Sequence, residues 1–484
     1  MSKSNRGTIP LVESRQQLLD NLVQSTDARH CMALARDLVE CGDASTAEQL
    51  LPLVAEERGA VSEAAAFLLA EWSIHGHVPA AHVPAIVKGL AHASPEVRQW
   101  CAACLRGLGP DAGDAVGPLI DALHDSDNGV RQAAVDALGQ IAPDDESLLL
   151  RLVDLLSDEE PVRNAVIRVL AGLEGGHEEV FRKIAASFRD PAPELRAGAA
   201  AAAGKLLRIR PDFVARLVDC LNDFHANVRM EAARSLSEIP EPPRSVVLGL
   251  GKALRDPVSA VRQEAARALD ILGSASACAV PYLLAVLTDP DSTVRFHAVE
   301  ALEKLAPRQA DMLPAVVLAL GNRLIDADSG VQTRALTAFS KLAPYAFPLN
   351  PHLHRALQSP DTEIRLAAVE ALAHIRHEGL RVRDILRRAL SDPDGSVRVA
   401  AALALAKRQE RGIEVVSTLV SALREPGARV QVSAIRALRT LGPDAACALT
   451  ALEAKREDSN PDIRHLAELA IRSIAGHALT ESDA

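Results

Sequence analysis

The sequence predicts an all-α protein, an alpha-alpha superhelix in which short helix pairs stack one after another. First, apolar residues make up 48% of the 484 residues, which is enough to bury a core. Second, the chain has only 12 aromatic residues (Trp 2, Tyr 2, Phe 8), so its core must consist of small aliphatic side chains that suit close helix contacts. Sheet proteins rely on aromatic and β-branched residues, and an all-β fold is therefore disfavoured. Third, one short motif recurs along most of the chain.

The recurring motif is clearest in four segments, DSDNGVRQAAVDAL from Asp125, DPVSAVRQEAARAL from Asp256, DPDSTVRFHAVEAL from Asp289 and DPDGSVRVAAALAL from Asp392. In each copy a key aliphatic residue, Val, Leu or Ile, precedes a position that recurs in twelve places: 98, 131, 163, 196, 229, 262, 295, 332, 365, 398, 431 and 464. The steps are 32 or 33 residues, with one step of 37. Such regular spacing indicates about 12 clear structural repeats of 33 residues.

Each repeat is predicted to form two helices. Val261 to Leu272 carries apolar residues at three- and four-residue steps, and Val280 to Leu287 carries a second apolar stripe. Asp291 is expected to cap the next helix, and Pro281 lies near a helix start, as do Pro84, Pro118, Pro211 and Pro314. Glycines at expected helix ends, where they would act as C-caps, are Gly109, Gly139 and Gly442. One helix pair cannot bury its stripe alone, so the pairs must stack into an alpha-solenoid.

The ends of the chain depart from the motif. Residues 1–90 are expected to form an N-terminal helical cap with degenerate repeats, residues 91–475 the repeat solenoid, and residues 476–484 a disordered polar tail. The 37-residue step contains four extra residues near Gly321 to Leu324, about one helical turn, which are expected to lengthen a helix and act as a hinge. Just beyond them, Pro344 to His354 is the chain's richest cluster of Pro, aromatic and His residues.

The motif resembles the HEAT family, especially the short bacterial HEAT-like repeats with the signature D-x-D-x-x-V-R-x-x-A-x-x-A-L, similar to those of the bilin lyases of phycobilisome assembly. The resemblance covers roughly residues 92 to 475. It implies a HEAT-like alpha-solenoid, and it implies function only broadly, because the family spans scaffolds, adaptors and a few enzymes. A bilin lyase-like chromophore attachment factor remains an alternative function.

Charge and cysteine content narrow the possible partners. Lys and Arg number 53 against 64 Asp and Glu, a net charge of −11, so no nucleic-acid partner is expected. A HEAT-like DNA glycosylase would need a basic groove with aromatic contacts and is disfavoured for the same reason. No 18-residue apolar run and no secretory signal is apparent, so no membrane partner is expected. Seven irregularly spaced cysteines suggest a reduced, cytoplasmic protein, and the high Ala, Leu and Arg content suggests a bacterial one.

The sequence shows few features typical of an enzyme. In the HEAT-like deoxyhypusine hydroxylases, His-Glu pairs that follow the V-R dipeptide hold two irons, whereas the corresponding pairs here include Met230-Glu231 and Phe296-His297. His75, His77 and His82 are interpreted as solvated loop residues, and Cys101 and Cys104 as buried helix residues. The sequence also lacks the phosphate-binding glycine motifs and the nucleophile elbow. No cofactor, no metal site and no catalytic residue is therefore predicted.

Two sets of positions stand out within the repeats. Arginine follows the key aliphatic residue in ten of the twelve copies, and an acid lies five residues before it in nine, so these residues are predicted to pair as a structural ladder. In solenoids of this type the second helix lines the concave surface, where the second and sixth residues after the key aliphatic should be exposed. The second position is largely apolar from Met230 onward, and the sixth position carries arginines interleaved with acids. An exposed apolar strip beside arginines is typical of a protein-binding groove.

The sequence therefore predicts a non-catalytic protein–protein interaction scaffold or adaptor subunit that binds a protein partner in this groove. The predicted partner-binding residues are Met230, Arg234, Glu264, Arg267, Phe296 and His297. Trp100 and the segment Tyr345 to Phe347 are further candidate anchors, because aromatic residues are so few.

Overall fold

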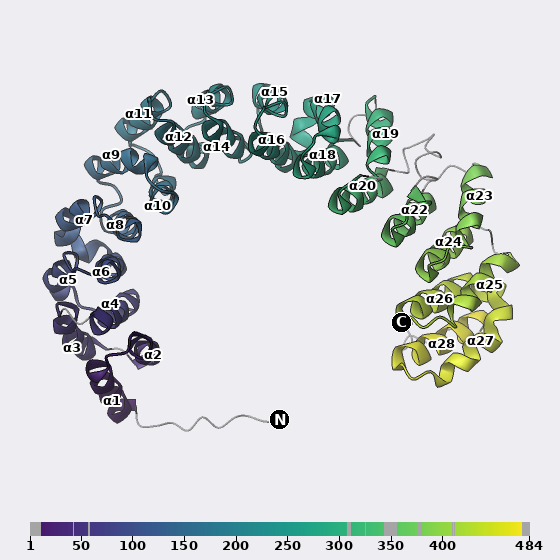
Figure 1. Cartoon of the computed structure of the whole chain (residues 1–484), viewed down its shortest axis with the longest axis horizontal. Helices are drawn as coiled ribbons and strands as arrows, with labels where there is room; N and C mark the ends of the chain where they lie inside the picture. Colours follow the sequence, from purple (N-terminus) through teal and green to yellow (C-terminus); the bar gives the residue numbers. More distant parts are fainter. Residues whose placement is uncertain are drawn as a thin grey trace. The chain divides into compact units, whose positions relative to one another are not determined.

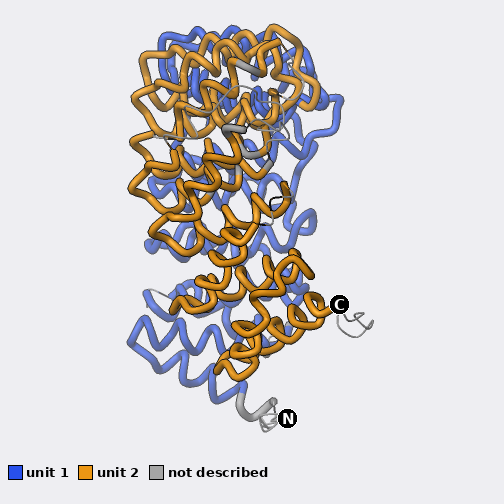
Figure 2. Tube along the Cα trace, turned by 90° about the vertical axis from the view of Figure 1, so that its right-hand side faces the viewer, with its two compact units in different colours: residues 1–239 blue, residues 240–484 orange. Residues whose placement is uncertain are grey.

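A computed structural model describes residues 11–41, 43–56, 59–306, 311–324, 326–342, 356–374, 380–408, 410 and 412–476. The chain divides into two compact units, Met1–Ile239 and Pro240–Ala484, which are coloured separately in Figure 2. Within the described residues the secondary structure is entirely helical, which confirms the predicted all-α class. The cluster Pro344 to His354 and residues 477–484 lie outside the described residues.

Unit 1 is a stack of helix pairs in two rows, with the first helix of each pair on the outside of the curved stack and the second on the inside (Figure 1). The first row consists of α1(Leu11–Gln24), α3(Ala44–Val54), α5(Val83–Gly89), α7(Val116–Ala122), α9(Glu146–Asp154), α11(Glu178–Ser187) and α13(Phe213–Cys220). The second row consists of α2(Ala28–Leu38), α4(Gly59–Ile74), α6(Pro95–Leu108), α8(Asn128–Ile141), α10(Glu160–Ala171), α12(Pro193–Leu206) and α14(Ala226–Leu236). Helix α4 packs on α6, so the N-terminal helices join the same stack, and the predicted division at residue 90 stays a prediction.

Unit 2 repeats the two-row arrangement. Its first row consists of α15(Arg244–Ala253), α17(Val280–Ala285), α19(Leu313–Arg323), α23(Leu380–Ala389), α25(Ile413–Ala422) and α27(Leu449–Ala454). Its second row consists of α16(Ser259–Leu272), α18(Ser292–Leu305), α20(Ser329–Leu342), α22(Thr362–His374), α24(Gly395–Lys407), α26(Ala428–Leu441) and α28(Pro461–Ile474). Successive second-row helices pack on one another, so each repeat buries its apolar stripe mainly against its neighbours.

The helix ends agree with most of the expected start and stop residues. Asp291 caps α18 by accepting a hydrogen bond from the backbone N–H of Thr293 at 2.9 Å. Gly109, Gly273 and Gly442 end their helices with φ between 52° and 58°, a conformation that residues other than glycine rarely adopt. Pro84, Pro281 and Pro314 lie in the first turn of their helices, whereas Pro211 precedes α13.

The expectation for Gly139 is wrong. This glycine lies inside α8, which continues to Ile141. A methyl group at Gly139 would lie 2.4 Å from a Cγ atom of Val169 in α10. The glycine therefore lets the side chain of Val169 approach α8 closely. Its role is close helix packing rather than helix termination.

Alanine and glycine bring the helices close together, as the aromatic-poor composition predicts. The alanines of the motif are buried in repeat after repeat, and Trp72, Phe181, Phe213 and Phe339 are the fully buried aromatic residues among the described ones. The closest approach of a glycine to a backbone atom is at Gly198 in α12, where an added Cβ would lie 2.1 Å from the carbonyl oxygen of Leu156. Side-chain volume at such contacts therefore sets the spacing of the repeats.

The arginine ladder, defined as the arginines that follow the key aliphatic residues together with the acids at the turns, is confirmed. Arg262 is typical: its Nη1 donates to the carbonyl oxygen of Asp256 at 2.9 Å, within its own repeat. Its Nε and Nη2 donate to the two carboxylate oxygens of Asp289 in the next repeat, at 2.7 and 2.9 Å. The same two-sided contact joins Arg98 to Asp125, Arg131 to Asp158, Arg196 to Asp223, Arg295 to Asp326 and Arg365 to Asp392.

Other repeats use variants of this contact. Where the key position is Gln431, its amide donates to the carbonyl oxygen of Glu425, and Lys455 bridges Gln431 to Asp458 at 3.0 and 2.8 Å. Lys455 therefore replaces the missing arginine, a substitution that the motif alone does not reveal. Arg163 keeps the contact within its own repeat, to the carbonyl oxygen of Asp158 at 3.1 Å, and lines a small cavity.

The ladder also locates the four-residue insertion. Arg262 and Asp289 are separated by 27 positions, whereas Arg295 and Asp326 are separated by 31 and still pair. The extra residues therefore lie between them, and α19, with 11 residues, is one residue longer than α15, α23 and α25. The ladder tolerates the insertion, and its role as a hinge stays a prediction.

One stretch of described residues, Ser259–Thr288, has the length and mean hydropathy, 1.8, of a membrane-crossing helix. In the structure this stretch is not one straight helix. Helix α16 ends at Gly273, which has a φ of 52°, and a 3-10 turn, Gly273–Ala279, leads into α17. The stretch is therefore a helix followed by the first helix of the next repeat.

Candidate functional site

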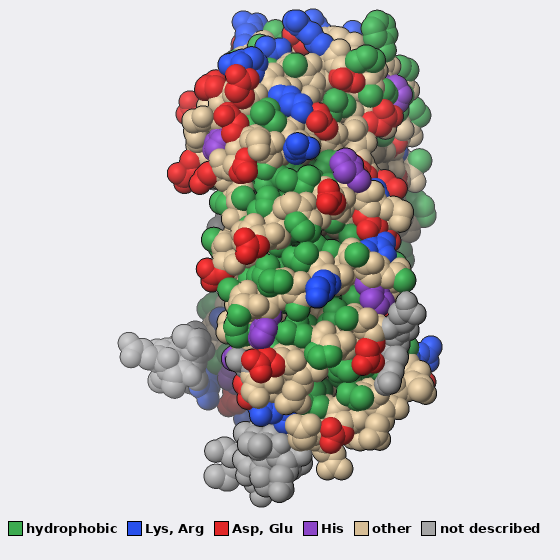
Figure 3. Space-filling view, turned by 90° about the vertical axis from the view of Figure 1, so that its left-hand side faces the viewer, with side chains coloured by type: hydrophobic (Ala, Val, Ile, Leu, Met, Phe, Trp, Pro, Cys, Tyr) green, Lys and Arg blue, Asp and Glu red, His purple; other side chains and the backbone are tan. Residues whose placement is uncertain are grey.

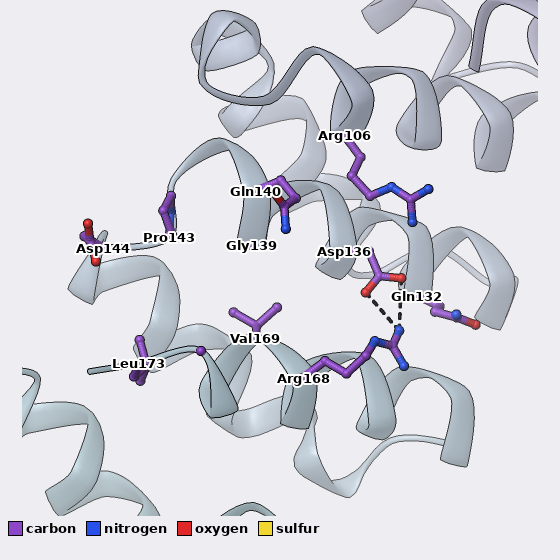
Figure 4. A pocket seen from close by; sticks show the side chains of 11 residues that line it. Arg106, Gln132, Asp136, Gly139, Gln140, Pro143, Asp144, Arg168, Val169 and Leu173 are labelled. Carbon is purple, nitrogen blue, oxygen red and sulfur yellow. Dashed lines mark hydrogen bonds and ion pairs between the residues drawn. The ribbon is translucent and has the colours of Figure 1, made fainter. Parts of the chain in front are cut away.

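A cavity with a volume of about 840 Å³ lies on the second-row helices of unit 1. It opens along α6, α8 and α10, and Figure 4 shows it from close by. We call it the α8 groove; its lining residues are Arg106, Gln132, Asp136, Gly139, Gln140, Pro143, Asp144, Arg168, Val169, Gly172 and Leu173.

One end of the α8 groove is polar. Arg168 donates from Nη2 to both carboxylate oxygens of Asp136, at 2.9 and 3.1 Å, while 56% of the Arg168 side chain remains exposed. Arg106 extends from α6 toward the same opening (Figure 4), and among the described residues its guanidinium has no carboxylate partner. This end thus presents two guanidinium groups against one carboxylate, although the chain as a whole is acidic.

The other end of the α8 groove is apolar. Val169, Pro143 and Leu173 line it, together with Gly139, over which Val169 packs, and Gly172, the residue that follows α10. The amide of Gln140 projects between the two ends (Figure 4). The groove is therefore amphipathic along its length, with hydrogen-bond donors at one end and an aliphatic surface at the other.

The sequence placed three of these residues at exposed positions of the second helix but did not select them as partner-binding residues. Gln132 occupies a second position, and Asp136 and Arg168 occupy sixth positions, of their repeats, and these positions were expected to face outward on the second helix. Arg106, Gly139 and Gly172 were missed as site residues because they lie later in the repeat. The one sequence signal at Arg106 is the lack of an acid three or four positions away on its helix, and Arg436 and Arg439 share that signal.

The predicted residues Met230 and Arg234 lie on α14 of unit 1. Met230 lines a smaller cavity of about 140 Å³ together with Arg163, Glu194 and His225. Arg234 is half-exposed and pairs with Glu231 on its own helix at 3.1 Å. These two residues are thus outside the α8 groove.

The other predicted residues, Glu264, Arg267, Phe296 and His297, lie on α16 and α18 of unit 2. Arg267 pairs with Glu264 at 2.7 Å, so its charge is already neutralised on its own helix. Phe296 packs edge-on against His297, with ring centroids 5.6 Å apart. Both rings are half-buried rather than freely exposed.

The expected exposed apolar strip is only partly present. Met230, Phe296, Leu366 and Val432 are half-buried, and Val399 is 4% exposed. Neighbouring second-row helices stack closely enough to cover the second position of the motif. Trp100 is likewise half-buried, packed edge-on against Phe67 with a centroid separation of 5.1 Å.

A family model for HEAT repeats matches residues 83–171, 179–249, 247–340, 349–415 and 383–472, which together span well over half of the chain. The chain belongs to the HEAT-repeat family. Within this family, the finer resemblance to bilin lyases rests on the sequence motif alone. Among curated proteins, no match to the sequence was found.

Solved structures with the same fold include nuclear transport receptors. Kap95p, the yeast importin-beta, in a complex with RanGDP shares 15% identity and a TM-score of 0.64, over 97% of this chain and 72% of that chain. An importin-beta crystallised with ammonium sulfate shares 14% identity and a TM-score of 0.58, over 96% and 72% of the two chains. A Kap121p mutant shares 14% identity and a TM-score of 0.57, over 98% and 62%. Likeness at this identity shows the fold alone.

One group of possible metal ligands occurs among the described residues of this HEAT array: Asp270 on α16 with His297 and Glu300 on α18, whose donor atoms lie within 4.8 Å of one another. Lys304 donates to Asp270 at 2.6 Å, and Arg334 pairs with Glu300 at 3.0 Å. These cations already neutralise both carboxylates, so a metal ion would have to displace them.

The two helix cysteines of the HEAT motif behave as predicted. Cys101 and Cys104 are buried in α6, and Cys104 contacts the carbonyl oxygen of Leu69 at 3.3 Å. Burial raises the pKa of Cys104 to about 12 and raises that of Cys101 further. Both thiols therefore stay protonated at neutral pH and are poor metal ligands and poor nucleophiles.

Proposed function

We propose that this HEAT array is a non-catalytic protein-interaction scaffold that holds a segment of a partner protein against its second-row helices, with the α8 groove as the contact in unit 1. The observation that carries the proposal is a cavity of about 840 Å³ with an arginine and amide groups left for an external partner. Stacked helix pairs offer such extended surfaces more readily than they offer an enclosed catalytic pocket.

The side chains of the α8 groove support binding rather than covalent chemistry. Its lining residues supply guanidinium, amide, carboxylate and aliphatic groups, and none of them is Ser, Thr, Cys, His or Lys. Both carboxylate oxygens of Asp136 already accept hydrogen bonds from Arg168. Structures with the same fold bind proteins, as Kap95p does with RanGDP and with Nup1.

The face formed by the first-row helices of unit 1 is the alternative binding surface for a partner. Viewed from the first-row side, hydrophobic side chains lie across the middle of the face, and acidic side chains lie mainly toward its upper left edge (Figure 3). The second-row face, with its groove and paired charges, is the better candidate for specific recognition.

A photo-crosslinking amino acid placed in the chain tests this assignment. Gln140, exposed in the α8 groove, and Arg151, exposed on first-row α9, provide matched positions in the same unit. We expect cells of the native host to yield a discrete crosslinked protein from position 140 and not from position 151. Crosslinks from position 151 alone, or from neither position, contradict the proposal.

The predicted residues of unit 2 form a second proposed contact. We expect a double substitution, Arg267→Ala with Phe296→Ala, to abolish partner binding while leaving the melting temperature unchanged, because both side chains are partly exposed on the second-row face. Binding is measured with the partner captured by crosslinking, and melting by circular dichroism. Retained binding excludes this contact.

A further inference from the structure

The charges at the polar end of the α8 groove are not balanced. Arg168 is matched by Asp136, but Arg106 is exposed on α6 with no carboxylate partner among the described residues. Asp144, at the far end of the groove, is 90% exposed and lies 3.8 Å from His177. An unmatched guanidinium beside a cavity favours a ligand that supplies a carboxylate, because the planar fork of arginine matches the two oxygens of that group.

The apolar end defines the rest of the ligand. Val169 is half-buried, packs over Gly139 of α8 and lines the cavity together with Pro143 and Leu173. The amides of Gln132 and Gln140 line the same cavity and make no hydrogen bond to other described residues. Free side-chain amides can pair with the N–H and C=O groups of a peptide backbone.

We propose that the α8 groove recognises an extended peptide segment of a partner protein, in which one acidic side chain pairs with Arg106 and neighbouring aliphatic side chains cover Val169. This inference rests on the proposed scaffold function and names the chemistry of its partner in unit 1. Charge complementarity selects the acidic residue, and the adjoining aliphatic surface selects the side chains next to it.

The acidity of the whole chain makes this recognition local. With a net charge of −11, the protein repels acidic molecules at long range, so an acidic peptide gains attraction only at a specific site. Nonspecific binding of acidic peptides is thereby suppressed, and a single substitution at Arg106 is sufficient to test the pairing.

The test uses fluorescence anisotropy with the full-length protein and three labelled peptides. Each peptide has about 12 residues, which extend over roughly 40 Å, and carries leucines on both sides of a central residue within a glycine–serine chain. The central residue is glutamate, glutamine or lysine. The proteins are the wild type, Arg106→Gln, Arg106→Lys, and Arg151→Gln as the control, because Arg151 is an exposed arginine on the first row of the same unit.

We expect the glutamate peptide to bind the wild type about tenfold more tightly than the glutamine peptide, and the lysine peptide to bind more weakly still. Arg106→Gln should remove the preference for glutamate, Arg106→Lys should retain part of it, and Arg151→Gln should leave it unchanged. Equal binding of the glutamate and glutamine peptides, or equal losses in the two arginine-to-glutamine variants, overturns the inference. Displacement of the glutamate peptide by a short oligothymidylate assigns the site to phosphate instead and also overturns it.

Failure of this inference is distinguishable from failure of the scaffold function. If a protein crosslinks at position 140 and its binding is unaffected by Arg106→Gln, the scaffold function stands and recognition of an acidic segment is excluded. If no protein crosslinks at position 140, the proposal that the α8 groove binds a partner is excluded, whatever the peptide measurements show.

Discussion

A ladder arginine uses both sides of its guanidinium group. In Arg262, Nη1 donates a hydrogen bond to a backbone carbonyl oxygen of its own turn. Nε and Nη2 donate to the carboxylate of Asp289 in the next repeat. Both side chains of this pair are largely shielded from water, with exposed fractions of 12% and 7%. A pair that is shielded and hydrogen-bonded on several sides stabilises more than an exposed surface pair.

We expect Arg262→Met to lower the free energy of unfolding by about 2 kcal/mol, because it leaves the Asp289 carboxylate and turn carbonyl groups without their donor. The matched control is Arg182→Met, which removes an exposed pair with Glu179 and should cost less than about 0.5 kcal/mol. Urea unfolding followed by circular dichroism measures both. Equal losses in the two variants indicate that the ladder adds nothing beyond surface pairing.

The ladder also predicts a dependence of stability on pH. The hydrogen bonds from Arg98 hold the pKa of the Asp125 carboxyl below 3.8, against the opposing effect of burial. A carboxyl whose pKa is lower in the folded state stabilises the fold above its unfolded pKa, about 3.9, and loses that contribution as the pH falls through the folded pKa. Asp125→Asn should therefore lower the melting temperature at pH 7, with a difference that shrinks below about pH 4. If the melting temperatures of the variant and the wild type differ by the same amount at pH 7 and below about pH 4, ionisation of Asp125 does not contribute to stability.

At the scale of helices, glycines have two distinct structural roles, helix termination and close helix packing. Gly109 and Gly442 end their helices with positive φ, whereas Gly139 and Gly198 lie inside helices where another helix or turn approaches closely. Sequence spacing placed Gly109, Gly139 and Gly442 at helix ends, but it could not separate the two roles, because the close approach at Gly139 depends on Val169 in the neighbouring repeat.

Gly198→Ala should destabilise unit 1 by about 1–3 kcal/mol, since its new methyl group would meet the Leu156 backbone, which cannot rotate away. Gly117→Ala in α7 is the matched control: nothing lies within 4 Å of its Cβ position, and alanine favours helix, so stability should stay level or rise by up to about 1 kcal/mol. Chemical unfolding distinguishes the two. Tolerance of Gly198→Ala would show that α12 can shift without cost.

The candidate site shows the limits of sequence reasoning at this scale. The period of the motif predicted that the second and sixth positions face outward, and Gln132, Asp136 and Arg168 in the α8 groove agree with this. The groove itself depends on the packing of Val169 over Gly139 and on the direction of Arg106, which follow from contacts between repeats. Likewise, the motif placed Arg267 near a groove but did not show that Glu264 already neutralises it.

At the scale of the whole chain, contacts are mostly between neighbouring repeats, and the chain divides at Ile239 into two compact units. The repeats, their number and the ladder were predictable because each copy carries its own motif. The division into units was not, since no change of motif marks residue 239.

We expect residues 1–239 and 240–484 to fold separately when each is produced alone, because stability in stacked repeats is a sum of local and nearest-neighbour contributions. Circular dichroism should show helical spectra for both fragments, and calorimetry of the full chain should show two transitions. A fragment that is unfolded alone, or a single transition for the intact chain, contradicts this expectation.

The ladder has a consequence for how such a chain changes length. Each standard repeat carries an acid that receives the arginine before it and an arginine that reaches the acid after it, 27 positions along. Where the repeats on both sides are standard, duplication or loss of one whole 33-residue module joins an arginine to an equivalent acid at the new junction. A gene for this protein can therefore lengthen or shorten by in-frame recombination between such repeats. Each product then retains the arginine–carboxylate contact at the point of exchange.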